Sequence, residues 1–181
     1  MIFLSPGHLL YAFPFFELMP QYKCPPTHLE CTHVDNCLNP ELYPVDWTAE
    51  RSLYNWVESL NLQCAEPYQI GLFGSMYFAG STALGIFVSR AGDVFGRKWV
   101  SGASAAIALP LQIAMIFSRS IALTTVLSFL MGTTHFGRGQ VSFVYICELV
   151  PKKNRTMTGS LVLFLDSATI MILSFWFLYV S

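Results

Sequence analysis

Charged residues are scarce in this chain. Aspartate, glutamate, lysine and arginine make up only 12% of its 181 residues, whereas hydrophobic residues make up 54%. Soluble globular proteins carry about 25% charged residues, because their surfaces must be solvated. The composition therefore excludes an ordinary soluble domain and predicts an integral membrane protein.

The chain also lacks the motifs of several functional classes. It contains no glycine-rich P-loop and no serine–histidine–aspartate arrangement, so we expect neither an enzyme nor a bound cofactor. Its 10 basic and 11 acidic residues give a net charge of −1, unlike the strongly basic surface of a nucleic-acid-binding protein. We therefore expect the lipid bilayer as a partner, and no nucleic acid.

Long apolar runs are present instead. A helix needs roughly 20 residues to cross the hydrocarbon core of a bilayer. Four segments meet this requirement and a fifth, shorter one is interrupted by two prolines: 68–88, 99–117, 121–147, 157–180 and 2–19. They predict an all-α, multi-pass membrane protein with about five transmembrane helices.

The runs divide the chain into three parts. Residues 1–19 are expected to form a first span, which is so short that it could be a truncated one. Residues 20–67 form a polar loop, and residues 68–181 hold spans two to five. A cleaved signal peptide is the alternative for the first part. No basic residues precede its apolar run and no small-x-small cleavage site follows it, so a span is the better interpretation.

Basic residues indicate the orientation. Six of the 10 cluster in two short links, at Arg90, Arg97 and Lys98 and at Lys152, Lys153 and Arg155. Short links rich in lysine and arginine face the cytoplasm, so the N-terminus is expected there too. The 20–67 loop, with seven acids and two bases, is then extracellular or lumenal.

Cysteines agree with this orientation. Four of the five lie in the 20–67 loop, at Cys24, Cys31, Cys37 and Cys64. An oxidising compartment favours two disulfides, and all three possible pairings stay open. The alternative is a metal site built from Cys24, His28, Cys31, His33 and Cys37, which the absence of a C-x-x-C pair disfavours, so no metal is expected.

A motif between spans two and three carries a family resemblance. Residues 89–98 read SRAGDVFGRK, which resembles the G-x-x-x-D-[RK]-x-G-[RK]-[RK] loop of the major facilitator superfamily. Asp93, Gly96, Arg97 and Lys98 match this pattern, whereas a serine and a valine replace the leading glycine and the first basic residue. The resemblance implies a cytoplasmic gating motif that latches neighbouring helices, although a generic basic turn would look similar.

Two further stretches refine the resemblance. Residues 145–155 resemble the Y-x-x-E-x-x-P-x-x-x-R ending of span four in sugar porters and organic cation transporters, with Glu148 and Arg155 in place. A carboxylate at a helix C-terminus needs a cation, and either Arg155 or Arg97 is expected to supply it. Residues 56–64 and 74–80, together with the cysteine-bearing loop, resemble organic cation and carnitine transporters.

Ionisable residues inside spans predict a solute site. Arg138 and Asp166 both lie 10 residues from the inner ends of their spans, at a depth of about 15 Å. His135, Arg138, Ser142 and Tyr145 are spaced by 3, 4 and 3 residues, which puts them on one face of a regular helix. We expect these four and Asp166 to line a solute path; a permanent Arg138–Asp166 ion pair is the alternative.

The resemblance implies transport of a small organic solute, of the organic cation or zwitterion class, by alternating access. Five spans would make an incomplete N-terminal six-helix half of a 12-span fold, so the chain is expected to be a fragment completed by a second half. A shortened, carrier-like structural subunit working with other membrane subunits, a sugar-porter-like transporter and a self-associated pore are the alternatives.

Overall fold

The computed structural model describes residues 6–25, 31–49 and 52–179, and every regular element among them is a helix. The long helices are α4 (Pro67–Phe95), α5 (Arg97–Phe117), α6 (Ile121–Phe136) and α8 (Arg155–Tyr179). The shorter ones are α1 (Pro6–Phe16), α2 (His33–Leu38), α3 (Trp56–Ser59) and α7 (Ser142–Leu149). The prediction of an all-α fold is confirmed.

Among the residues that the structure describes, three helices are long and apolar enough to cross a membrane, over Pro67–Phe95, Arg97–Phe117 and Lys152–Phe177. The span predicted at 121–147 is divided into α6, a π-helical turn η3 (Gly137–Val141) and α7, which follow one another without a gap. The first predicted span corresponds to α1, whose start is preceded by residues outside the described part of the chain.

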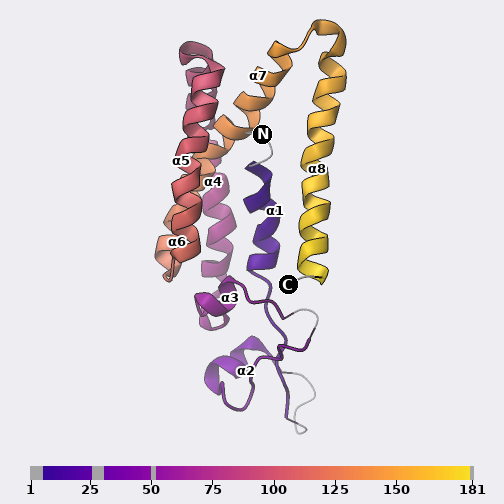
Figure 1. The fold of residues 1–181 in the computed structure, drawn as a ribbon. Coiled ribbons are helices and arrows are strands. Elements are labelled where there is room, and N and C mark those ends of the chain that lie inside the picture. Colours follow the sequence, from indigo (N-terminus) through magenta and orange to yellow (C-terminus); the bar gives the residue numbers. More distant parts are fainter. Residues whose placement is uncertain (1–5, 26–30, 50–51, 180–181) are drawn as a thin grey trace.

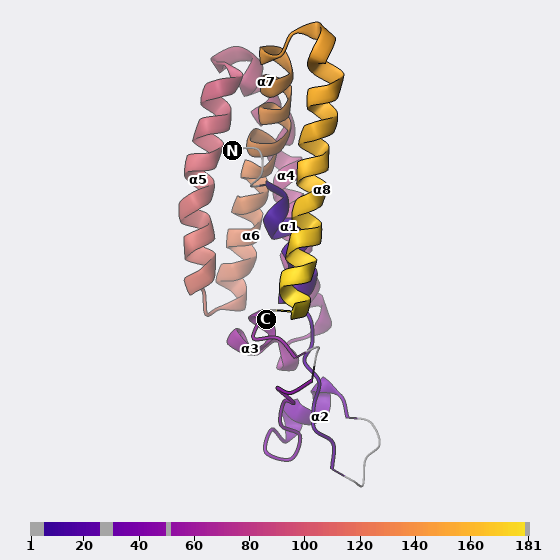
Figure 2. The ribbon, with the colours of Figure 1, turned by 45° about the vertical axis from the view of Figure 1, so that its right-hand side comes forward.

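The long helices alternate in direction (Figures 1 and 2). The α4–α5 and α7–α8 links lie at the same end of the bundle. The α5–α6 turn and the cysteine-bearing segment with α2 and α3 lie at the other end. A short 3-10 turn, η4 (Lys152–Asn154), forms part of the α7–α8 link. Both basic links therefore share one end, as a common orientation relative to a membrane requires.

Helices α4 and α6 touch through their backbones. A methyl group added at Gly80 would collide with the carbonyl oxygen of Phe129, and one added at Gly132 would collide with the carbonyl oxygen of Tyr77. Small residues allow such close approach in membranes, where dispersion contacts replace the hydrophobic effect between helices. The two glycines thus fix the closest helix pair in the bundle.

Helix α1 lies between this pair and α8. The Phe13 ring makes edge contacts with Tyr77 of α4 at 5.6 Å and with Trp56 of α3 at 6.0 Å between centroids. On the opposite side Phe15 stacks on Phe177 of α8, with centroids 4.5 Å apart. Aromatic contacts therefore connect α1 to both sides of the bundle.

Two disulfides stabilise the segment between α1 and α4. They join Cys24 to Cys31 and Cys37 to Cys64, which selects one of the three pairings left open by the sequence. Cys24, Cys31 and Cys37 are all in disulfides here, so their thiolates are not available to the alternative metal site, whose His28 lies outside the described residues. The second bond attaches α2 to the turn η2 (Leu62–Cys64), just before α4.

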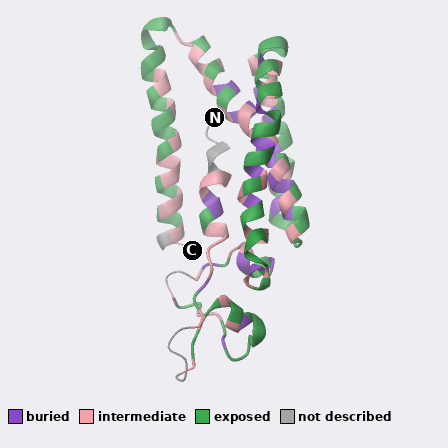
Figure 3. Ribbon diagram, turned by 180° about the vertical axis from the view of Figure 1, so that it is seen from behind, coloured by how far each residue is buried: buried purple, intermediate pink, exposed green. Residues whose placement is uncertain are grey.

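Large apolar side chains cover the outside of the bundle. Figure 3 shows α8 as exposed or half-buried along its described length, and the exposed side chains there include Leu161, Phe164 and Ile172. Such a surface is unfavourable in water and favourable against lipid tails. This pattern agrees with the membrane location predicted from composition.

We expect Gly132→Ala to lower the melting temperature of the purified protein by about 5 °C, because overpacking costs about 1–3 kcal/mol. The matched control is Gly74→Ala in α4, where an added methyl group meets nothing within 4 Å. The control should melt at the wild-type temperature or slightly above it, since alanine favours helix. Equal melting temperatures for the two variants would contradict the close α4–α6 contact.

Peptide mapping tests the disulfides. Mass spectrometry of the unreduced, digested protein should find Cys24 linked to Cys31 and Cys37 linked to Cys64. Cys147, a free cysteine in α7, should be alkylated without prior reduction. A crossed link, such as Cys31 to Cys64, would refute this connectivity.

Candidate functional site

A group of polar side chains lies inside the bundle, where four helices and the π turn meet. We call it the central polar cluster, and its members are Tyr11 of α1, Tyr77 of α4, His135 of α6, Arg138 of η3 and Asp166 of α8. The Tyr11 hydroxyl donates a hydrogen bond to Asp166 Oδ2 at 3.3 Å. The Tyr77 hydroxyl is hydrogen-bonded to His135 Nδ1 at 2.9 Å.

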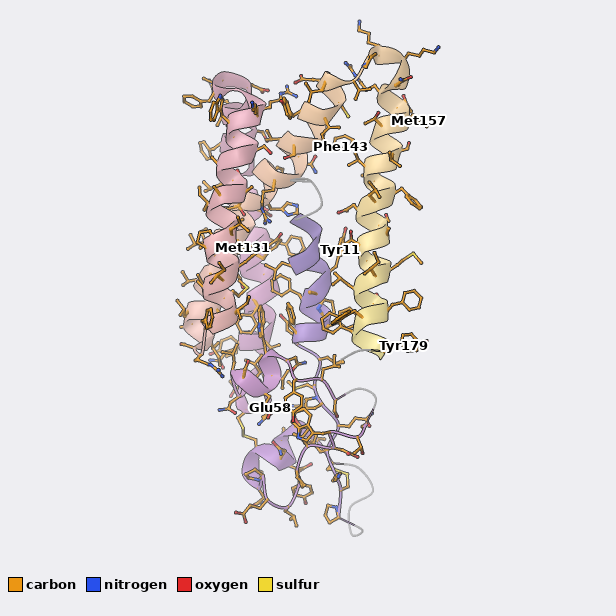
Figure 4. The ribbon with its side chains drawn as sticks, viewed as in Figure 1. Tyr11, Glu58, Met131, Phe143, Met157 and Tyr179 are labelled. Carbon is orange, nitrogen blue, oxygen red and sulfur yellow. A yellow bond between two sulfur atoms is a disulfide. The ribbon has the colours of Figure 1, made fainter. Side chains whose placement is uncertain are left out.

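The tyrosine at position 11 stands between α1 and α8 (Figure 4), so its bond to Asp166 connects these two helices. The ring of Tyr77 is almost wholly buried, at 1% exposed, and points to α6, where it meets the ring of His135 edge-on. One tyrosine thus binds the acid of the cluster and the other binds its imidazole. Ionisable groups in such positions mark functional sites in membrane proteins.

Arg138 occupies the π turn, and its side chain is 1% exposed. It interacts electrostatically with both Tyr77 and His135. A π turn carries one more residue than an α turn and recurs at functional sites in helices. Here it places a guanidinium group in the interior beside α4, where burial of a charge is costly without polar neighbours.

The acid and the arginine of the cluster are separate. No ion pair joins Arg138 to Asp166 among the described residues; Asp166 bonds to Tyr11 instead. Asp166 still acts electrostatically on His135, so both charges influence the same imidazole. The alternative of a permanent Arg138–Asp166 pair is not what the structure forms.

The polar face predicted for span four is interrupted. Ser142 is buried against α5, where its hydroxyl is hydrogen-bonded to that of Ser101, and it also donates to the carbonyl of Gly137 at 3.2 Å. The π turn changes the helical phase after Arg138, so the regular spacing no longer applies. Tyr145 is half-buried on α7, on the far side of the π turn from His135.

A second group of charges lies at the end of the bundle with the basic links. Arg97, the first residue of α5, binds Asp93 Oδ1 of α4 at 3.0 Å and Glu148 Oε1 of α7 at 3.1 Å. We call these three residues the end network. The arginine side chain is 26% exposed, and the two acids are 65% and 53% exposed, so each pair is worth about 0–1 kcal/mol.

Two glycines shape the end network. Gly96 has φ +93°, which glycine adopts without strain, and it allows the sharp change of direction between α4 and α5. Gly92 faces Val141, with 3.2 Å between an added methyl carbon and Val141 Cγ1. A hollow of about 190 Å³ lies beside them, lined by Ser89, Asp93, Arg97 and Gln140 among others.

The structure selects one of two expected partners for Glu148. Arg97 makes the bond, whereas Arg155 and Lys98 are exposed and form no ion pair within the described ranges. Tyr11 and Tyr77 were missed by sequence reasoning, because an uncharged tyrosine in an apolar run gives no signal of polar function. The hydroxyl group within an apolar span is the only feature of these two residues in the sequence that points to a polar role.

Comparisons with known proteins agree with this architecture. The model of the Major Facilitator Superfamily matches residues 45–179. "Organic cation/carnitine transporter 4" of Arabidopsis thaliana is 27% identical over 161 residues, which are 88% of this chain and 30% of the relative. "Solute carrier family 22 member 4" of Mus musculus is 29% identical over 134 residues, which are 74% of this chain and 23% of the relative.

The chain thus spans about 30% of the length of the first relative and 23% of the second. No solved structure matches it. The matched region begins in the cysteine-bearing segment and contains the end network and most of the central polar cluster. Because this match covers most of the chain and confirms the resemblance of its motifs, the chain belongs to the major facilitator superfamily.

Proposed function

We propose that the chain contributes one wall of a membrane carrier for a small organic solute of the cation or zwitterion class. The central polar cluster carries this proposal, because it gathers an acid, an arginine, a histidine and two tyrosines from separate spans. Carriers of this architecture bind solute near the middle of the membrane, between two halves. The second half, or other membrane subunits, would complete the site.

The chemistry of the cluster fits a charged solute. The Asp166 carboxylate suits an ammonium group, and the face of Tyr11 adds cation–π attraction. Arg138 suits a carboxylate at the other end of a zwitterion. A sugar carries no charge to complement an acid and an arginine, so the cluster favours the organic cation class over the sugar-porter alternative. The names of the two relatives support the same class.

His135, Ser142 and Tyr145 have different parts in this proposal. His135 is hydrogen-bonded to Tyr77 of α4 and lies near enough to both Arg138 and Asp166 to interact with their charges, so we assign it to the surface that lines the solute site. Ser142 positions α7 against α5 through Ser101. Tyr145 lies on the next turn toward the end network and lines the path between the two sites.

The end network would act as the inner latch during alternating access. Asp93, Gly96, Arg97 and Glu148 hold three helix ends together, and Lys98 and Arg155 supply positive charge around them. This end would face the cytoplasm, and residues 20–67 would form an extracellular or lumenal domain. The support for this orientation is the basic character of both links at one end.

Asp166→Asn tests the solute site. In cells expressing the native protein that contains this chain, uptake of labelled tetramethylammonium should fall about tenfold or more at constant surface level. The reason is the loss of a charge-assisted interaction worth about 1.5–3 kcal/mol. The matched control is Ser167→Ala on the next, exposed position, whose hydroxyl bonds only to Leu163 O of its own helix.

Normal uptake by Asp166→Asn, with Ser167→Ala also normal, would remove Asp166 from the solute site. Labelled carnitine provides the second readout, since it carries both an ammonium and a carboxylate. Arg138→Lys should reduce carnitine uptake more than tetramethylammonium uptake, because lysine cannot bind a carboxylate through two parallel bonds. An equal reduction for both solutes would contradict the assignment of Arg138 to a carboxylate.

Asp93→Asn tests the latch. We expect the maximal uptake rate to change by up to about fivefold, the equivalent of about 1 kcal/mol for an exposed pair, with little change in KM. Arg90→Gln is the control, because this exposed residue of the same link forms no ion pair among the described residues and is not one of the latch residues. If Asp93→Asn changes KM alone, the network belongs to binding and the latch assignment fails.

A further inference from the structure

A dense group of positive charges lies where the chain enters α8. Lys152 and Lys153 are in the turn η4, and Arg155 is the first residue of the helix. All three side chains are exposed, and none forms an ion pair within the part of the chain that the structure describes. We call these three residues the α8 basic turn.

Nothing described nearby neutralises these charges. Glu148, the acid that precedes them in α7, is already bound to Arg97 at 3.1 Å. The dipole of α8 adds to the problem, since its positive end lies at this turn and repels cations. The α8 basic turn is therefore a site of unbalanced positive potential.

The turn lies directly above an apolar helix surface. Met157 follows it on α8 and is 78% exposed (Figure 4), and Leu161 and Phe164 continue the exposed surface along the same helix. Trp99, 75% exposed near the start of α5, lies at this end too, and tryptophan favours the interface of a membrane. An anion bound at the turn would thus sit at the headgroup level, with hydrocarbon beneath it.

We propose that the α8 basic turn binds the headgroup of an anionic phospholipid. Lys152 and Lys153 contact the phosphate and the additional anionic group, and the acyl chains lie along Met157 and Leu161. Basic residues next to a membrane helix each contribute about 1 kcal/mol to binding of anionic lipid, which is about fivefold in affinity. This inference depends on the geometry of α8 and is independent of the proposed transport.

Native mass spectrometry of the full chain in detergent tests the proposal. Dioleoyl phosphatidylserine and dioleoyl phosphatidylcholine are added at equal concentration, and the lipid adducts are compared. We expect at least about tenfold more phosphatidylserine adduct than phosphatidylcholine adduct on the wild type. Lys152→Gln with Lys153→Gln should reduce it by about tenfold or more, to the level of phosphatidylcholine. Arg155 is left unchanged, because it belongs to the proposed gating motif.

The control removes the same charge at the opposite end of the bundle. Lys23→Gln with Arg119→Gln changes exposed residues of the cysteine-bearing segment and the α5–α6 turn, and should keep the phosphatidylserine adduct. If both double variants lost the phosphatidylserine adduct equally, the effect would depend on net charge alone, and the proposed site would be overturned. Displacement of the lipid by millimolar inorganic phosphate would assign the turn to a free anion and overturn the lipid proposal.

Discussion

The backbone contact between α4 and α6 is the constraint on which the interior depends. Gly132 meets the carbonyl of Tyr77, the residue whose hydroxyl bonds to His135 one turn along α6. A larger residue at position 132 would separate the helices and lengthen that hydrogen bond. The contact that stabilises the pair of helices therefore also sets the geometry of the central polar cluster, so packing and function share the same residues.

The π turn is the second feature that shapes the interior. With regular α-helical spacing, Arg138 and Ser142 would share a face. The additional residue in the turn leaves Arg138 in the cluster and rotates Ser142 toward Ser101 of α5. A single local irregularity thus gives α6 and α7 different partners.

Composition and motifs predicted much of this protein. The apolar runs correspond to the helices, and the loop motif marked Asp93 and Arg97, which do form a bond. The sequence could not select Arg97 over Arg155 as the partner of Glu148, because the order of residues along the chain does not show which of the two side chains lies beside Glu148 in the fold. It missed Tyr11 entirely, since the bond to Asp166 joins residues 155 positions apart and depends on how α1 packs against α8.

The two charged sites differ in strength in a way that suits different roles. The end network is partly solvated, so its bonds contribute little individually and would break and reform readily in the proposed transport cycle. Two members of the central polar cluster, Tyr77 and Arg138, are buried, and a buried polar group depends more on its polar partners than an exposed one. Each tyrosine hydroxyl supplies one hydrogen bond to the cluster, and in the proposed carrier a charged solute would supply further polar contacts. In the proposed carrier, a weak inner latch beside a strongly polar interior would let the energy of solute binding in the middle of the membrane decide whether the helix ends stay together.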